Sequence, residues 1–161
     1  RHFFHINESI MGSTFTQLYI HVVFSVKRRE RLISKHWKEE LYKYIAGIIA
    51  NKKQVLYIIN GDMDHVHILL GMSPDISISE LVKEIKRSSS LFVNEKRLSV
   101  GRFSWQEGFG AFSIGKSEMS RIIGYIKDQE VHHHRNSFTE EYEKFLTSYG
   151  IEYKKEYLWK E

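Results

Sequence analysis

The chain of 161 residues contains no cysteine and only one proline. Without cysteine it can form neither disulfide bonds nor thiolate metal sites, so a bound metal ion would need histidine, carboxylate or amide ligands. The sequence also lacks an apolar run near the roughly 20 residues that cross a membrane. It has no secretion signal of a basic start, an apolar stretch and a small-residue cleavage site. We therefore expect a cytoplasmic protein with no membrane partner.

The length and composition are those of one globular domain. A chain of 161 residues is long enough to bury a core but short for two domains. The hydrophobic share of 42% and the aromatic share of 14% suit a folded chain better than a disordered one. We assign residues 16–161 to a single domain and residues 1–15 to an N-terminal extension.

Positive charge slightly exceeds negative charge, with 24 Lys and Arg against 20 Asp and Glu. This balance is a weak indication of a polyanionic partner. The basic residues form separate groups that folding could bring together: Lys27, Arg28, Arg29 and Arg31; Lys83, Lys86 and Arg87; Arg121 and Lys127. Charges scattered over a solvated surface would explain the same composition equally well.

Hydrophobic periodicity predicts strands and helices in alternation. Apolar residues at every second position are typical of a half-buried strand, and a spacing of three or four is typical of an amphipathic helix. We expect strands at residues 17–25, 55–59, 65–70 and within 103–114, and helices at 37–51, from 77, at 117–133 and at 137–150. The order predicts an α+β, ferredoxin-like (βαββαβ, RRM-like) sandwich with an antiparallel sheet, followed by a C-terminal helix that carries Tyr125.

Short motifs predict two helix starts and one turn. Ser77 with Glu80, and Ser137 with Glu140, have the spacing of capping boxes, which begin helices. Asn60-Gly61 is a turn signal between the second and third predicted strands.

Two histidines lie one residue apart in the stretch GDMDHVHILL, residues 61–70. In a strand, residues i and i+2 point the same way, so His65 and His67 share one face while the apolar residues between them face the core. Neutral imidazoles are common ligands of divalent metals, and Asp62 or Asp64 could orient one of them. From this pattern alone, hydrogen-bonded or surface histidines are the commoner explanation.

Tyr125 and Gln129 lie four residues apart on the flank of the helix expected at residues 117–133. A tyrosine in this position normally packs its ring at the rim of the core and leaves its hydroxyl in water. A reactive role needs a cation that stabilises the phenolate or polarises a phosphate. His65 and His67 would hold that cation, and Gln129 could add a carbonyl oxygen.

Three further histidines occupy residues 132–134, one turn beyond Gln129. His133 is an alternative metal ligand. A run of histidines at the end of a helix is more typical of a contact with the helix dipole and with phosphate.

Together these residues resemble the single-tyrosine HUH transposases of the IS200/IS605 group. The resemblance covers most of the chain from about Thr16. The segments that carry it are YIHVVFSVKRRERL, DHVHILL, SISELVKEIKRSSS, WQEGFGAFSI and IIGYIKDQEVHH. The second of these is the His-hydrophobe-His motif, and the last resembles the helix that bears the tyrosine.

The resemblance implies a DNA transposase that cleaves and rejoins single-stranded DNA at the ends of an insertion sequence. Tyr125 matches the nucleophile, which forms a 5′-phosphotyrosine and leaves a free 3′ hydroxyl. His65 and His67 match the metal-binding histidines, and Gln129 matches the glutamine that completes a Mg²⁺ or Mn²⁺ site. The enzyme would be a metal-dependent single-strand endonuclease and strand transferase.

The resemblance also implies partners and a setting. It predicts a homodimer whose active sites are shared between subunits, bound to DNA with hairpin ends, in the cytoplasm of a bacterium or archaeon and associated with the nucleoid. Phosphates need cations and unpaired bases need aromatic rings. The candidate DNA-binding residues are Lys27, Arg28, Arg29, Lys83, Lys86, Arg87, Trp105 and Arg121, with Phe109 as a second aromatic candidate.

Two other functions remain open from the sequence. One is a domesticated, REP-associated tyrosine transposase that cuts genomic hairpin repeats without moving its own gene. The other is a non-catalytic module that binds single-stranded nucleic acid on the same kind of sheet.

Overall fold

A four-stranded antiparallel sheet forms the centre of the protein. The computed structural model describes residues 14–133 and 137–158, so most of the expected extension at residues 1–15 lies outside the described residues. The strands are β1 (Leu18–Ser25), β2 (Val55–Asp62), β3 (His65–Met72) and β4 (Gly110–Ile114), in the order β2-β3-β1-β4. All three pairings are antiparallel, which confirms the predicted ferredoxin-like α+β fold.

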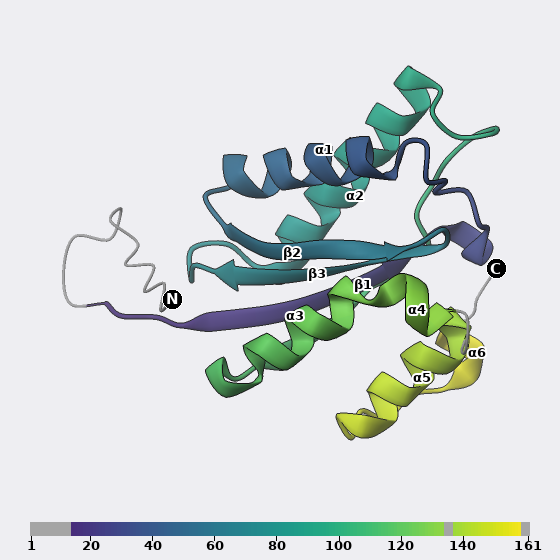
Figure 1. Ribbon diagram of the computed structural model, residues 1–161. Coiled ribbons are helices and arrows are strands. Elements are labelled where there is room, and N and C mark those ends of the chain that lie inside the picture. The colour runs from purple at the N-terminus through teal and green to yellow at the C-terminus, as the bar shows by residue number, and fades with distance from the viewer. Residues whose placement is uncertain (1–13, 134–136, 159–161) are drawn as a thin grey trace.

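Helices cover both faces of this sheet (Figure 1). The described helices are α1 (Lys38–Asn51) and α2 (Ile78–Lys96) on one face, α3 (Met119–Lys127), α4 (Gln129–His133) and α5 (Phe138–Ser148) on the other, and the short segments η1 (Lys27–Arg29), η2 (Lys116–Glu118) and α6 (Lys155–Leu158). Nucleic-acid modules of this fold read bases on an open sheet face. Here α3, α4 and α5 cover that face. Among the described residues, no helix combines the length and apolarity needed to cross a membrane.

Strand β3 is buried on both faces, which decides where its histidines point. Alternate residues from Val66 to Leu70 pack into the core formed with α1 and α2. Leu69 belongs to the opposite face and packs against α3. Because side chains alternate along a strand, His65 and His67 lie on the same face as Leu69. They therefore face the layer of α3, α4 and α5.

The hairpin between β2 and β3 turns later than the sequence predicts. Asn60-Gly61 is not a turn; both residues belong to β2, and the turn lies at residues 63–64. Gly61 is needed for the close approach of the two strands, because a Cβ there would collide with the carbonyl oxygen of His65. As a result Asn60 pairs directly with His67.

The helix predicted at residues 117–133 is interrupted at Asp128, whose φ and ψ of −94° and 22° are not helical. The amide of Asn60 on β2 donates to the carbonyl oxygens of Ile126 at 3.0 Å and Lys127 at 3.1 Å. A continuous helix would use these carbonyls for its next turn. The side chain of Asn60 thus occupies the acceptors at the end of α3, and the chain restarts as α4.

Both predicted helix starts are present, and each has the serine half of its capping box. The Glu80 N–H donates to Ser77 Oγ at 3.1 Å, and the Glu140 N–H donates to Ser137 Oγ at 3.3 Å. These bonds satisfy backbone donors that a helix start leaves free. They fix the beginnings of α2 and of α5, the helix that lies over the two histidines.

Candidate active site

His65 and His67 are both fully buried on the face of β3 that the sequence predicts. The Nδ1 atom of His65 lies 2.7 Å from Asp64 Oδ1, so the carboxylate accepts the Nδ1–H and directs Nε2 into the protein. The other predicted carboxylate, Asp62, instead lies 3.3 Å from Arg31 Nη2. Of the two candidates, Asp64 is therefore the one that orients a histidine.

Gln129 meets His65 although α4 and β3 are distant in the sequence. The Gln129 Oε1 atom lies 3.0 Å from His65 Nε2, and the glutamine side chain is fully buried. A carbonyl oxygen and an imidazole nitrogen are both metal donors, and here they point at the same place. The interruption at Asp128 sets the position of Gln129 relative to the preceding turn.

Tyr125 on α3 lies beside His67, with ring centroids 5.9 Å apart and an edge-on angle of 81°. Its hydroxyl hydrogen-bonds with the side chains of Glu141 and Gln129. Burial, followed by the negative charge of Glu141, raises the pKa of the Tyr125 hydroxyl well above its ordinary value. In this arrangement the phenol is neutral, and its hydroxyl donates a hydrogen bond to the Glu141 carboxylate.

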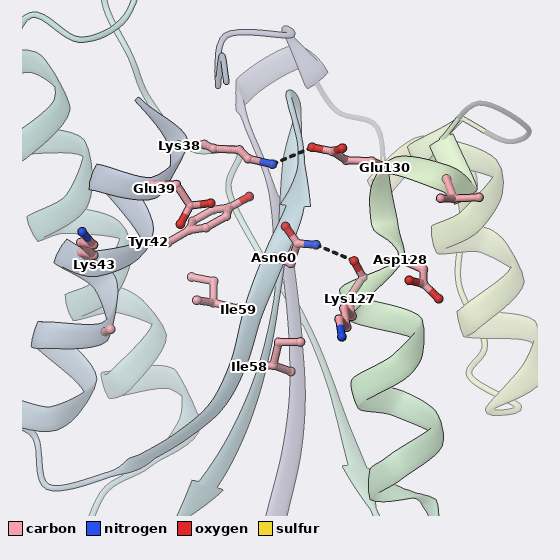
Figure 2. A pocket seen from close by; sticks show the side chains of 12 residues that line it. Lys38, Glu39, Tyr42, Lys43, Ile58, Ile59, Asn60, Lys127, Asp128 and Glu130 are labelled. Carbon is pink, nitrogen blue, oxygen red and sulfur yellow. Dashed lines mark hydrogen bonds and ion pairs between the residues drawn. The ribbon is translucent and has the colours of Figure 1, made fainter. Parts of the chain in front are cut away.

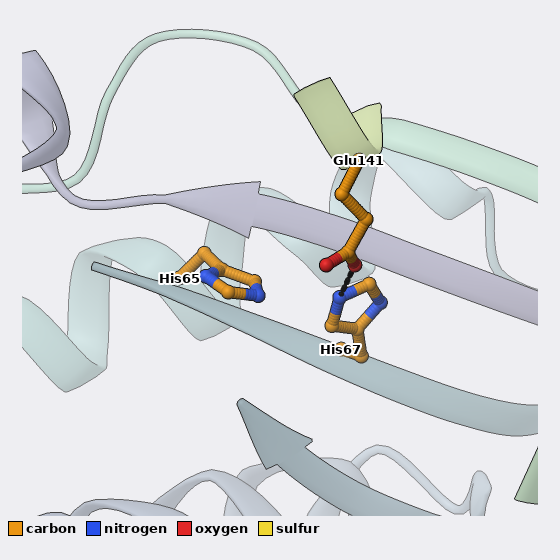
Figure 3. Close-up of side chains that lie close together, drawn as sticks. All are labelled: His65, His67 and Glu141. Atoms are coloured by element: carbon orange, nitrogen blue, oxygen red, sulfur yellow. Dashed lines mark ion pairs between the residues drawn. The ribbon is translucent and has the colours of Figure 1, made fainter. Parts of the chain in front are cut away.

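Glu141 on α5 is a site residue that the sequence reasoning missed. Its Oε1 atom lies 2.7 Å from His67 Nε2, and the residue is only 6% exposed. Figure 3 shows the carboxylate reaching down from its helix to the two histidines. A signal was available, because Glu141 falls between Phe138 and Phe145 on the apolar stripe of an amphipathic helix, where a charged residue is unusual.

His21 on β1 is a second missed residue. It is fully buried, its Nε2 lies 2.9 Å from His67 Nδ1, and the two rings stack at 5.1 Å and 25°. Burial, and next the neighbouring His67, lowers the pKa of His21 to about 3, with Glu141 acting in the opposite direction. The ring is therefore neutral. The strand alternation predicted for residues 17–25 places this histidine on the face away from the main apolar stripe, which was the available signal.

The donor atoms fit a divalent cation. One donor atom from each of His65, His67 and Glu141 lies within 4.8 Å of the others, and all three residues are buried. Gln129 adds an amide oxygen beside His65. A buried carboxylate beside two imidazoles favours a bound cation, since an uncompensated charge in the interior is costly. The alternative ligand His133 belongs to α4, but its side chain lies outside the described residues.

The basic turn that follows β1 lies at the same end of the sheet as His65. Lys27 and Arg28 are exposed and Arg29 is half-buried in η1. Hydrogen bonds to residues 104–106 hold the turn in place. The last residue of β1 pairs with His65, so the turn that carries these three predicted DNA-binding residues begins close to His65 in the sheet.

Three other predicted DNA-binding residues are exposed on helices. Lys83 and Arg87 lie on α2, on the face of the sheet away from the histidines. Arg87 Nη2 contacts Glu84 at 3.0 Å, and Arg121 Nη2 on α3 contacts Glu118 at 3.1 Å. The structure does not bring them together with the candidate site, and their DNA contacts stay a prediction.

The side chain of Lys86 is partly buried and hydrogen-bonded to the backbone, and does not extend into solvent. Its ammonium donates to the carbonyl oxygens of Gln106 at 2.6 Å and Gly108 at 2.5 Å and lies 5.5 Å from the centre of the Phe24 ring. Burial lowers the pKa of Lys86 to about 8, with Glu107 opposing the change. In this position it fastens the loop before β4.

Trp105 is packed in the core. It is 9% exposed, its Nε1–H donates to Ser89 Oγ at 2.9 Å, and its ring meets Phe24 and Phe103 edge-on. The indole is therefore packed against side chains of the protein and hydrogen-bonded within it. Phe109, the second aromatic candidate, is 38% exposed. Base stacking by either ring stays a prediction.

A separate cavity of about 630 Å³ lies between α1, β2 and the junction of α3 with α4 (Figure 2). An ion pair of 2.7 Å between Lys38 and Glu130 spans the cavity. Asn60 lines it and donates a hydrogen bond to the carbonyl oxygen of Lys127. None of its lining residues is a donor of the histidine site. The cavity thus adjoins the interruption that positions Gln129 but is a different site.

The pattern of the family described as "Transposase IS200 like" matches residues 14–129 of the chain. This stretch contains both histidines of β3, Tyr125 and Gln129. It ends before α5, so Glu141 lies beyond the part that the family shares.

Individual proteins are similar over most of the chain. The ISDra2 transposase TnpA of Deinococcus radiodurans is 25% identical over 118 residues, which is 70% of this chain and 84% of that protein. A crystal structure of a candidate transposase from Deinococcus radiodurans R1 covers 74% of this chain and 96% of its own, with a TM-score of 0.57 and 20% identity. A REP-associated tyrosine transposase bound to a REP hairpin covers 78% of this chain and 74% of its own, with a TM-score of 0.59 and 15% identity. These two structures share the fold.

Proposed function

The chain belongs to the family of IS200-like transposases, and on this premise we propose that it cleaves and rejoins single-stranded DNA at insertion-sequence ends through a covalent phosphotyrosine. One observation carries the proposal. Residues of β3, α3 and α4 that are distant in the sequence meet in one buried site, where Gln129 Oε1 lies 3.0 Å from His65 Nε2 and Tyr125 lies beside His67. A nucleophile next to a set of metal donors is the arrangement that phosphoryl transfer requires.

In the proposed reaction the Tyr125 oxygen attacks the scissile phosphorus. The oxygen–phosphorus bond to Tyr125 forms as the bond to the 3′ oxygen breaks. The phenol gives up one proton and the departing 3′ oxygen takes one up, which leaves a 5′-phosphotyrosine and a free 3′ hydroxyl. Rejoining is the reverse step, and it needs no ATP because the covalent link conserves the energy of the phosphodiester bond.

The residues that would hold Mg²⁺ or Mn²⁺ are His65, His67, Gln129 and Glu141. When bound, such an ion neutralises charge on the non-bridging phosphate oxygens and offsets the charge of Glu141 beside the phenol. The protein's own contribution is orientation. Asp64 accepts the Nδ1–H of His65 and so leaves Nε2 available to the site.

The basic turn of Lys27, Arg28 and Arg29 would receive the DNA backbone next to the site, because lysine and arginine neutralise phosphates. The likeness to a transposase bound to a REP hairpin supports hairpin-ended DNA as the substrate. His65, His67 and Gln129 are fully buried beneath the helical layer that includes α5. We propose that α5 moves aside before a phosphate reaches Tyr125.

The resemblance to single-tyrosine HUH transposases supports a homodimer. It also supports a location in the cytoplasm, at the nucleoid. Within one chain, Tyr125 already lies against the chain's own His67. This supports a site that is complete in a single subunit, whereas exchange of the tyrosine helix between subunits stays a prediction.

A domesticated, REP-associated transposase is the second candidate function, and the likeness to the REP-hairpin complex favours it. It would use the same residues on genomic hairpin repeats. Imperfect palindromes close to both ends of the gene would favour a mobile element instead. A non-catalytic module is less well supported, since α3, α4 and α5 cover the sheet face on which such modules bind bases.

The test is to incubate the protein with labelled single-stranded DNA from the flanks of its gene and Mg²⁺ or Mn²⁺. We expect a covalent adduct on a denaturing gel that chelation of the metal abolishes. Tyr125→Phe should bind the DNA without forming the adduct, and Tyr57→Phe, on the edge strand β2, should behave as the parent protein does. Cleavage at the same position by Tyr125→Phe would show that the nucleophile is a different residue.

A further inference from the structure

His21 makes a polar contact with His67, and the proposed reaction assigns it no role. It comes from β1, the strand next to β3. The centroid of its ring lies 6.0 Å from that of Phe112 and 5.5 Å from that of Phe145. Its Nε2 lies 2.9 Å from His67 Nδ1. Burying an imidazole among aromatic rings costs free energy, and a hydrogen bond to its polar atoms offsets part of that cost.

We infer that His21 is a positioning residue that sets which nitrogen of His67 carries the proton, and so controls whether His67 can bind a metal ion. The inference rests on the proposed function, since it assumes that His67 is a metal ligand. His67 presents Nε2 to Glu141 and Nδ1 to His21, so every polar atom of its ring has one defined neighbour. The proton can occupy either nitrogen, and the two neighbours decide between them.

With an ion on His67, the lone pair of Nε2 is the donor and the proton must be on Nδ1. His67 Nδ1–H then donates to the lone pair of His21 Nε2, and the proton of His21 sits on its Nδ1. Without an ion, His67 Nε2–H donates to the Glu141 carboxylate, and His21 Nε2–H donates to His67 Nδ1. The two rings therefore change tautomer together, and neither changes its charge.

The other nitrogen of His21 is consistent with this shared change. His21 Nδ1 is buried and has no hydrogen-bond partner among residues 14–133 and 137–158. It can lose or gain its proton without breaking a bond to another group. An anchored Nδ1 would fix His21 in one tautomer, and with it His67.

Two substitutions separate the hydrogen bond from the packing. His21→Phe keeps an aromatic ring among Phe112 and Phe145 but removes the partner of His67. His21→Gln loses the ring but places an amide, both donor and acceptor, near the position of Nε2. Mn²⁺ affinity is measured by calorimetry or by the electron paramagnetic resonance of free Mn²⁺, with no DNA present.

We expect Mn²⁺ affinity to fall by about 10- to 100-fold in His21→Phe, as is usual when the partner of a metal-bound histidine is removed, and to stay within about threefold of the parent in His21→Gln. Parent-like affinity in His21→Phe, or an equal loss in both variants, would overturn the inference. If the parent itself binds no Mn²⁺, the proposed metal site fails instead.

A measurement on the unaltered protein needs no variant. Nitrogen-15 spectra of the histidine rings, recorded with and without Mg²⁺, report the tautomer of each ring. We expect His67 to carry its proton on Nε2 without the ion and on Nδ1 with it, and His21 to change in the same titration. A His21 tautomer that stays constant while His67 changes would contradict the coupling.

Discussion

The Oε1 atom of Glu141 lies 2.7 Å from Nε2 of His67, which brings helix α5 into the site although α5 lies beyond residues 14–129, the part shared with the family. The same carboxylate hydrogen-bonds with the Tyr125 hydroxyl. One side chain thus contacts both a proposed metal-binding histidine and the proposed nucleophile. The C-terminal part of this chain therefore contributes directly to the chemistry that we propose.

Replacing Glu141 should weaken metal binding. In Glu141→Gln the buried carboxylate loses its charge while its shape is kept, so we expect Mn²⁺ affinity to fall by at least about tenfold. Calorimetric titration of the protein without DNA measures this. Glu140→Gln is the matched control. Glu140 is the exposed neighbour of Glu141 on α5, and its replacement removes the same charge. Equal Mn²⁺ affinity in the two variants would exclude Glu141 as a ligand.

Removing the Asn60 amide should disturb the position of Tyr125 and Gln129. Asn60→Ala loses two hydrogen bonds to the end of α3, so we expect a loss of about 1–2 kcal/mol in the free energy of unfolding and slower DNA cleavage at unchanged DNA affinity. Lys38→Ala, which breaks the ion pair across the same cavity, should cost less than about 1 kcal/mol and leave cleavage unchanged. Normal cleavage by Asn60→Ala would show that the interruption at Asp128 does not depend on this amide.

DNA binding should expose the amides of α5. If α5 moves aside for the phosphate, hydrogen exchange in residues 138–148 should speed up when hairpin-ended DNA is added to Tyr125→Phe, which binds without reacting. Residues 78–96 of α2, on the opposite face, are the internal reference and should exchange at an unchanged rate. Slower exchange in α5 on DNA binding would mean that the helix stays in place.

The basic turn should account for part of the salt dependence of DNA binding. Each phosphate contact to single-stranded DNA contributes about 0.7 to the slope of log affinity against log salt concentration. Lys27→Gln should therefore lower the slope by about that amount, whereas Lys43→Gln, exposed on α1 away from the site, should leave it unchanged. Equal slopes for parent and Lys27→Gln would remove the turn from the DNA path.

The local parts of the site could be predicted from the sequence. Strand alternation alone places His65 and His67 on one face, and a spacing of four residues places Tyr125 and Gln129 on one side of a helix. Both patterns depend only on backbone geometry within one element. The fold itself followed from the order of strands and helices.

The missed features depend on contacts between elements. Glu141 reaches His67 only because α5 docks over the sheet, and no local pattern states where a helix docks. At the interruption at Asp128, the end of α3 is hydrogen-bonded by Asn60 on another strand, in a dipeptide that the sequence assigned to a turn. The position of His21 in a strand was visible in the sequence, but its contact with His67 on the neighbouring strand was not.

The most direct test of the central claim is to identify the residue that carries the DNA. After reaction with hairpin-ended single-stranded DNA and Mn²⁺, the protein is digested with protease and nuclease, and the peptide that retains a nucleotide is sequenced by mass spectrometry. We expect a single modified peptide with a 5′-phosphonucleotide on Tyr125. A nucleotide on any other residue, or cleaved DNA without any modified peptide, would contradict the account.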